Sequence, residues 1–194
     1  MKITNVKVYD LEESIKASKY PMAVDLDNLD STITKTVKGL GKSKRGSGHD
    51  QFLTGIRVAF DLKCSNKMWV EMERYRFVDF VSSQSTMHRI TKFDIQDQVN
   101  EYVWIGTILN LSKMVQLYND LEDKTTDSAK ELYLQILYNT PSGFELTARL
   151  TTNYRALKTI YHQRKNHRLP EWREFCKWIE TLPYFQEIVL NTSK

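Results

Sequence analysis

Cysteine and long apolar runs are both scarce in this chain of 194 residues. Its two cysteines, Cys64 and Cys176, lie far apart in the sequence and form no CxxC pair. We therefore expect two buried thiols rather than a disulfide or a metal site. No apolar run approaches the roughly 18 residues needed to cross a bilayer, and the N-terminal segment lacks the apolar core of a signal peptide. These absences predict a cytoplasmic protein without a membrane partner.

The chain also lacks a large excess of charge of either sign. Its 28 basic and 24 acidic residues give a net charge of +4, which is too small to indicate nucleic acid binding. An apolar content of 41% is ordinary for a globular protein, and the length fits a single domain over residues 1–194. Positive charge is concentrated at 38–48 and 162–168, which suits a small anionic ligand.

Only seven glycines occur, and four of them fall within residues 24–48 together with five basic residues. This composition predicts a mobile loop or a lid over a ligand. The letters "GKS" at 41–43 invite comparison with a phosphate-binding loop. That motif requires a glycine five residues before Gly41, where this chain has Thr36. A flexible basic loop is therefore the favoured interpretation.

Hydrophobic periodicity and capping signals predict an α+β fold. A strand is expected at 2–9, and Asp10 with Glu13 is expected to cap a helix that Pro21 ends. Ser65 is expected to cap a helix that continues to about residue 80. Further strands are expected at 56–62 and 144–152, further helices at 94–121, 129–139, 153–164 and 171–182, and a turn at 141–143.

The polar residues give no simple catalytic or metal-binding motif. His162 and His167 are five residues apart, so they point to different sides of a helix, and no HExxH pattern accompanies them. Ser85 and His88 could form a nucleophile and its base, but no G-x-S-x-G elbow surrounds the serine. We therefore expect neither a bound metal nor hydrolase chemistry.

The stretch "SSQSTMHR" at 82–89 is unusual because it contains no glycine, proline or acidic residue and is poor in helix formers. Arg74 and Arg76 precede it and Arg89 ends it. Solvated surface charge is the alternative explanation for each of these arginines, and for Arg155 further along the chain. Their occurrence together with the polar run favours a binding site.

Several of these segments resemble the flavin-dependent thymidylate synthases. The sequence "HDQFLTGIRVAFDLKCSNKMWVEMERYR" at 49–76 resembles the strand and helix that lead to the family's Arg-His-Arg signature, here Arg74-Tyr75-Arg76. "TTNYRALKTIYHQR" resembles the family's Asn-x-Arg-x-Leu helix, with Asn153, Arg155, Leu157 and Arg164. "PEWREFCKWI" resembles the helix that follows, with Glu171 and Arg173 near the family's Glu-Ile-Arg.

The chain also departs from the family pattern. The family's Glu-His before its strand is Thr54-Gly55 here, and its signature Asn-Glu is Ser82-Ser83. The arginine that would hold the nucleotide phosphate is Met87, so its charge-assisted contact is lost unless His88 or Arg89 replaces it. The stretch 82–89 is therefore interpreted as the family's signature loop with changed residues.

The resemblance implies a mixed sheet with long helices and a homotetramer whose ligand grooves lie between subunits. It implies a nucleotide-like partner contacted by Arg74, Arg76, Ser83, Gln84, Ser85, His88, Arg89, Arg155 and Arg173. A flavin such as FAD would be contacted by Arg74, Tyr75, Arg76 and Asn153.

Two classes of function remain open. In the first, the protein binds or sequesters a nucleotide-like anion without converting it, as a phage-type protein in the host cytoplasm would. In the second, it is a flavin-dependent transferase that adds a methyl or hydroxymethyl group to a pyrimidine nucleotide. Binding is favoured because three positions that contact substrate in the family have changed together. The cofactor carries most of the chemistry in such enzymes, so the changes do not exclude activity.

Overall fold

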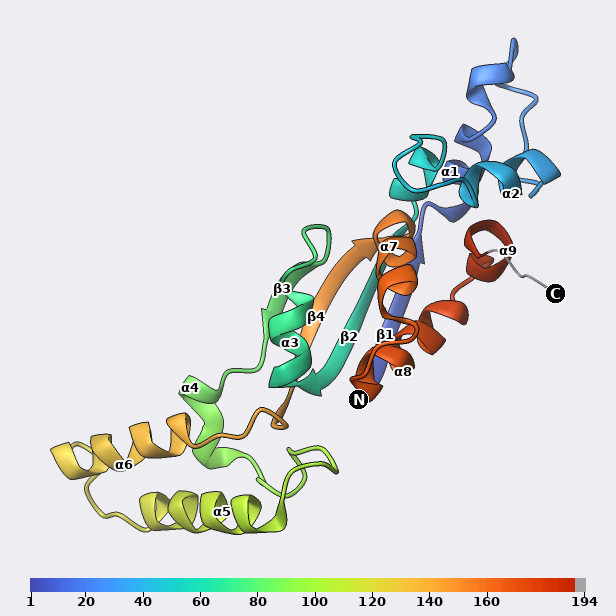
Figure 1. Ribbon diagram of the computed structural model, residues 1–194. Coiled ribbons are helices and arrows are strands. Elements are labelled where there is room, and N and C mark those ends of the chain that lie inside the picture. Colours follow the sequence, from blue (N-terminus) through green and yellow to red (C-terminus); the bar gives the residue numbers. More distant parts are fainter. Residues whose placement is uncertain (191–194) are drawn as a thin grey trace. The chain divides into compact units, whose positions relative to one another are not determined.

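A computed structural model describes residues 1–190 of the chain (Figure 1). Its elements, in order, are β1 (Lys2–Tyr9), α1 (Leu11–Ala17), the 3-10 helix η1 (Tyr20–Met22), α2 (Lys35–Gly41), the 3-10 helix η2 (Gln51–Thr54), β2 (Arg57–Ser65), α3 (Asn66–Met72), β3 (Asp79–Ser83), α4 (Thr86–Arg89), the 3-10 helix η3 (Ile90–Lys92), α5 (Ile105–Asn119), α6 (Asp127–Tyr138), β4 (Glu145–Asn153), α7 (Tyr154–Arg164), α8 (Pro170–Glu180) and α9 (Phe185–Val189). The expected α+β class is confirmed.

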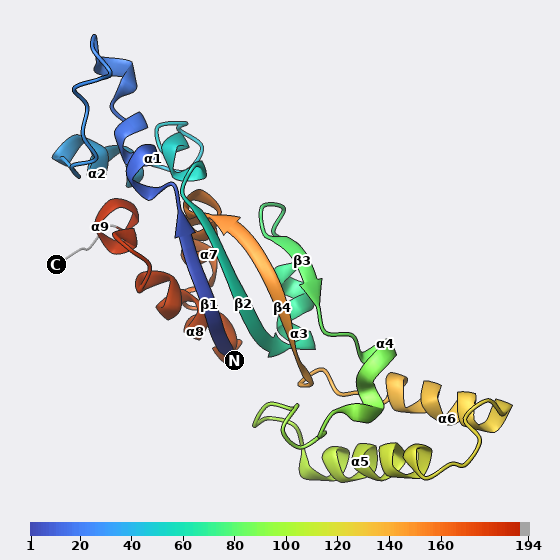
Figure 2. The ribbon, with the colours of Figure 1, turned by 180° about the vertical axis from the view of Figure 1, so that it is seen from behind.

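The four strands form one sheet in the order β1-β2-β4-β3. Neighbouring strands run in opposite directions, which Figures 1 and 2 show from two sides. The sheet is therefore antiparallel, and the expectation of a mixed sheet was wrong. The strands at 2–9, 56–62 and 144–152 are confirmed with small shifts of their ends.

The chain divides into two compact units. The first unit comprises Met1–Ile3, Asp61–Arg74 and Val81–Arg149, and the second comprises Thr4–Phe60, Tyr75–Phe80 and the described part of Leu150–Lys194. Strands β2 and β4 each begin in one unit and end in the other. The expectation of a single domain stays a prediction.

In the first unit, the core lies around the helix pair α5 and α6. Ile90, Leu111, Ile136 and Phe144 are buried together there.

Ser65 begins α3 as expected, because its hydroxyl accepts a hydrogen bond from the amide of Met68.

In the second unit, α8 packs on the sheet through aromatic side chains. Phe60 of β2 lies 5.9 Å from Phe175 and 4.6 Å from Trp178 between ring centroids. Pro170 occupies the first turn of α8, where its missing amide hydrogen is not needed.

Two predicted helix boundaries and one predicted capping bond were wrong. The helix expected at 94–121 begins only at Ile105, and the helix expected to reach residue 80 ends at Met72. Asp10 precedes α1 in a left-handed conformation, and its carboxylate accepts a hydrogen bond from the Ser14 hydroxyl instead of capping the helix. The expected loop at 24–48 contains α2, which Thr34 caps through the amide of Val37.

Candidate functional site

Asn153 joins strand β4 to helix α7 and sets the start of the candidate site. Its side-chain oxygen accepts a hydrogen bond of 2.9 Å from the amide of Ala156, which is the preferred role of asparagine at a helix start. Asn153 is buried, so the position of the helix start is well defined. Arg155 and Lys158 consequently lie in the first turns of α7, close to the end of the strand.

A buried carboxylate gathers these two cations. Asp50 is 1% exposed and accepts hydrogen bonds of 2.9 Å from Arg155 Nε and 2.7 Å from Lys158 Nζ. Arg155 also donates from Nη1 to Oε1 of Gln51, at 2.7 Å. Two cations therefore share one carboxylate, which leaves a local excess of one positive charge. Arg155 keeps a third of its side chain exposed and has further N–H groups to offer.

Lys158 is fully enclosed and has three oxygen partners. Besides Asp50, its ammonium group donates to the backbone carbonyls of Gly41 and Ser43, at 2.8 and 2.7 Å. The "GKS" segment therefore directs carbonyl oxygens at a cation. A phosphate-binding loop instead directs N–H groups at an anion, so this segment does not have the geometry of that motif.

Tyr75, in the middle of the arginine triplet, is held by α7 and α8. Its hydroxyl accepts a hydrogen bond of 2.7 Å from Arg164 Nε and donates one of 3.0 Å to Gln163. The Arg164 guanidinium lies 4.6 Å from the ring centroid of Trp172 and 5.5 Å from that of Tyr75. It also lies 2.8 Å from Nε2 of His167. Arg164 is thus a cation fixed between aromatic rings.

The other arginines that the sequence singled out differ in how they are held. Arg74 and Arg76 are exposed, and the Arg76 guanidinium lies 6.0 Å from the Phe77 ring centroid. Arg173 donates from Nη1 to the carbonyls of His167 and Arg168, at 2.7 and 2.9 Å, and so stabilises the turn between α7 and α8.

The polar stretch 82–89 forms the end of β3 and the short helix α4 in the first unit. Gln84 pairs with Thr147 twice, through its own amide and through its side-chain oxygen, both at 2.9 Å. Its side chain therefore extends the strand ladder. Ser83, His88 and Arg89 are exposed, and the Ser85 hydroxyl makes no capping bond to α4.

The structure therefore distributes the predicted site residues between the two units. Ser83, Gln84, Ser85, His88 and Arg89 lie together in the first unit, which also contains Arg74. Tyr75, Arg76, Asn153, Arg155 and Arg173 lie in the second.

Sequence reasoning did not find the two most organised groups, which are the Asp50–Lys158 pair and the Arg164 stack. The only signal for the first was a lysine placed between the apolar residues Leu157 and Ile160 on the buried face of α7. For the second, the tryptophan eight residues after Arg164 gave no indication of contact.

The end of α7 has a positive electrostatic environment. The pKa of His162 is lowered by burial and further by the charges of Lys165, Lys158 and Arg45.

Across residues 1–190, no group of histidine, cysteine, aspartate and glutamate side chains could hold a metal ion. In the same part of the chain, no helix has the length and apolar character to span a membrane.

Comparison with known proteins gives similarity in structure only. No family model matches the sequence, and no curated protein matches it. Two crystal structures of a flavin-dependent thymidylate synthase from Helicobacter pylori, both with FAD and dUMP, have TM-scores of 0.73 and 0.71 at 15% identity. Each alignment covers 98% of both chains.

A third solved structure is a UMP/dUMP methylase from Streptomyces cacaoi bound with 5-Br dUMP. It has a TM-score of 0.60 at 14% identity, over 97% of this chain and 92% of the methylase. The resemblance found in the sequence is thus confirmed for the fold, while the sequence has diverged far from those of the solved structures. The chain has the fold of the flavin-dependent thymidylate synthases.

Proposed function

We propose that this protein binds a nucleotide-like anion in a pocket between subunits and does not convert it to thymidylate. The observation that carries the proposal is the surplus positive charge at the start of α7, where Arg155 and Lys158 share Asp50 and Arg155 remains partly exposed. Proteins of this fold have been crystallised with dUMP or 5-Br dUMP, which supports a pyrimidine nucleoside monophosphate as the ligand.

Each unit carries proposed ligand contacts of its own. In the second unit, Arg76, Arg155 and Arg173 would offer guanidinium N–H groups to phosphate oxygens, and in the first unit Arg74 would do the same. From the first, His88 and Arg89 would replace the phosphate contact that Met87 cannot make. The remaining proposed contacts are Ser83, Gln84 and Ser85. The side-chain oxygen of Gln84 is already bonded to Thr147, so only its amide N–H groups would face a ligand.

A flavin fits this chain only in part. Arg74 and Arg76 make no ion pair within residues 1–190 and could hold a diphosphate. Tyr75 and Asn153 are the other proposed flavin contacts. Position 55, however, has no room for the family's histidine. A Cβ on Gly55 would lie 2.2 Å from the Ser14 hydroxyl oxygen, and that hydroxyl is fixed by its bond to Asp10. We therefore expect weak or absent FAD in the purified protein.

The second candidate function is a flavin-dependent methyl or hydroxymethyl transferase acting on a pyrimidine nucleotide. The solved structures of this fold include a thymidylate synthase and a UMP/dUMP methylase, which keeps this function open. Absorbance at about 450 nm, a property of the bound cofactor, separates the two candidate functions. A yellow protein that forms thymidylate from dUMP, a folate and a reductant would replace the binding proposal with the enzymatic one.

We also propose that the protein is located in the cytoplasm, or in the host cytoplasm if a phage encodes it. A further part of the proposal is self-association into a homotetramer. The support is exposed apolar surface. Trp104 is 73% exposed and Leu109 of α5 is 62% exposed, far more than apolar residues of a monomer core.

A calorimetric screen of mono-, di- and cyclic nucleotides tests the binding proposal. We expect at least one pyrimidine nucleoside monophosphate to bind, and no thymidylate to form when a folate and a reductant are added. Ser85→Ala should weaken binding because the hydroxyl makes no capping bond to α4 and can face a ligand. If no nucleotide binds the unmodified protein, the alternative of solvated surface charge is correct for these arginines.

A further inference from the structure

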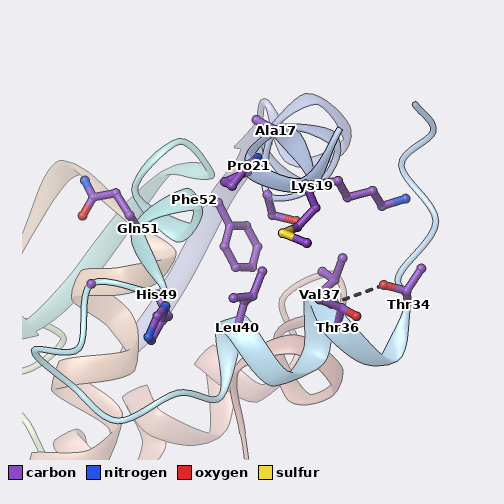
Figure 3. Close-up of a pocket in the computed structure, with 13 residues that line it drawn as sticks. Ala17, Lys19, Pro21, Thr34, Thr36, Val37, Leu40, His49, Gln51 and Phe52 are labelled. Carbon is purple, nitrogen blue, oxygen red and sulfur yellow. Dashed lines mark hydrogen bonds between the residues drawn. The ribbon is translucent and has the colours of Figure 1, made fainter. Parts of the chain in front are cut away.

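The second unit contains a cavity of about 900 Å³ that none of the proposed nucleotide contacts lines. Its walls come from three segments, the α1–η1 turn, helix α2 and residues 48–52 (Figure 3). Ala17, Met22, Val37, Leu40 and Phe52 are among the apolar lining residues. Figure 3 shows Leu40 and Val37 directed from α2 toward the side of the cavity where Phe52 lies. This volume lies within the range of small-molecule sites, which are roughly 300–1,000 Å³ and mostly apolar.

The walls are fixed by interactions that lie outside the cavity. Residues 48–52 contain Asp50, which is held by Arg155 and Lys158 of α7. Lys158 also binds the carbonyls of Gly41 and Ser43, where α2 ends. Two of the three walls are therefore fastened to one buried ammonium group. The cavity is formed before any ligand arrives and needs no closing loop.

Most polar groups of the lining already have partners. The Ser18 hydroxyl donates to the carbonyl of Ile15, and the Thr34 hydroxyl accepts from the amide of Val37. The Lys19 ammonium is bonded to Asp30, through both the backbone carbonyl and the carboxylate. Among the lining residues, the Thr36 hydroxyl and the His49 ring have no hydrogen bond to the described part of the chain. Few polar contacts are thus available to a ligand.

The segment that joins α2 to the lining residue His49 is positively charged. The loop between α2 and His49 contains Lys42, Lys44 and Arg45, and none of them has a carboxylate within ion-pair distance among the described residues. Lys19, by contrast, is neutralised by Asp30, whose pKa that ion pair lowers to about 2. An acidic group on a ligand would therefore be attracted to the end of the cavity formed by His49, and not to the end formed by Lys19.

We propose that this cavity binds an amphipathic organic acid, whose aromatic or aliphatic body lies between Phe52, Leu40 and Met22 and whose acidic group lies toward His49 and the basic loop. The apolar walls would bind the aromatic or aliphatic part of the ligand, and the unpaired cations would attract its acidic group. This site does not depend on the proposed nucleotide function, because its lining residues and its ligand chemistry are different. Asp50 and Gln51 connect the two, because both accept hydrogen bonds from Arg155.

The test uses two fluorescent probes on the full-length protein at neutral pH. Anilinonaphthalene sulfonate is an aromatic acid, and Nile red is an uncharged dye of similar size. We expect saturable binding of anilinonaphthalene sulfonate at one site per chain. Leu40→Glu places a carboxylate in the cavity and Ala17→Phe fills it, and each should weaken the affinity at least tenfold. If Leu40→Glu fails to fold, the affinity of Ala17→Phe alone tests the site.

Two matched controls separate the cavity from other surfaces. Leu134 is exposed on α6 in the first unit, so Leu134→Glu should leave the affinity unchanged. The pair Lys44→Gln and Arg45→Gln should weaken the sulfonate several-fold without changing Nile red binding. The site would be refuted if the Ala17 and Leu40 variants bound the sulfonate as tightly as the unmodified protein. It would also be refuted if the Leu134 variant lost as much affinity as they do. Unchanged sulfonate binding in the charge variant would refute the preference for an acid.

Discussion

Lys158 places a charged group in the interior of the second unit. Its side chain and that of Asp50 are each 2% exposed, and burial without partners would cost several kcal/mol per ion. Three oxygen acceptors satisfy the ammonium hydrogens, and Asp50 is satisfied by Lys158 and Arg155. The pair therefore joins α7 to the segment 41–50, which carries both the basic loop and one wall of the cavity.

Replacement of Lys158 by methionine should lower the free energy of unfolding by about 3 kcal/mol, because two carbonyls and part of Asp50 lose their partner in a buried site. Chemical denaturation followed by circular dichroism measures the change. Lys165→Met is the matched control, since Lys165 is exposed on the same chain segment and should change stability by less than about 0.5 kcal/mol. Equal effects of the two variants would contradict the structural role of Lys158.

His162 gives a prediction for pH. Its pKa in the folded chain is lowered by burial and then by Lys165, Lys158 and Arg45, so the unfolded chain binds the proton more readily. Stability should therefore be constant above the ordinary histidine pKa of 6.5 and fall as the pH decreases through that value. In His162→Gln this part of the decrease should disappear from denaturation curves measured at several pH values. An unchanged profile would show that His162 does not contribute.

The two thiols give a further prediction. Burial, followed by the charge of Glu180, raises the pKa of Cys176 to about 12, and Cys64 is fully buried. Neither should react with a thiol reagent in the folded protein at neutral pH, because the reactive thiolate is neither accessible nor, for Cys176, populated. Both should react after addition of denaturant. Rapid labelling of the native protein would contradict this burial.

At the scale of elements, Gln84 determines how β3 ends. Gln84 follows Ser83, the last residue of β3, and its side-chain oxygen accepts the amide hydrogen of Thr147. Gln84→Ala should expose this amide, increase its hydrogen exchange rate and cost about 0.5–1.5 kcal/mol. Gln84→Glu keeps an acceptor at the same reach and should retain the protection. If both variants exchange like the unmodified protein, the side chain does not extend the ladder.

Element types were predictable where one residue class repeated over a whole segment. The alternation in β2 and the asparagine before α7 are examples in which local preference and tertiary packing agree. The helix expected at 94–121 failed because residues 98–100 pair with the turn before β4. The amide of Glu145 donates to the carbonyl of Gln98, the amide of Asn100 to that of Gly143, and Val99 bridges Phe144. Such tertiary pairing has no local sequence signal.

At the scale of the whole molecule, the family motifs led to the fold but not to the arrangement of charges. The arginine triplet and the Asn-x-Arg-x-Leu helix pointed correctly to a flavin-dependent thymidylate synthase fold. Partners such as Asp50 and Lys158 are 108 residues apart in sequence. Which lysine finds which carboxylate over such a separation depends on the packed structure, so the burial of this pair could not be predicted.

Self-association also belongs to this scale. We expect light scattering to give four times the chain mass of 22.8 kDa at micromolar concentration. Leu109→Glu together with Leu117→Glu, both exposed on α5, should reduce the assembly, since charge on an apolar contact is costly to bury. Lys113→Glu on the same helix is the control for added negative charge. A monomer in the unmodified protein would contradict the proposed tetramer.

The most direct test of the nucleotide proposal is a paired calorimetric titration of a pyrimidine nucleoside monophosphate into three proteins. These are the unmodified chain, Arg155→Ala, and the control Arg57→Ala, which removes an exposed arginine from the start of β2. We predict saturable binding that Arg155→Ala weakens by about 1.5–3 kcal/mol, the scale of a hydrogen bond to a charged group, and that Arg57→Ala leaves unchanged. Absence of binding, or equal affinity in all three proteins, would contradict the proposed site.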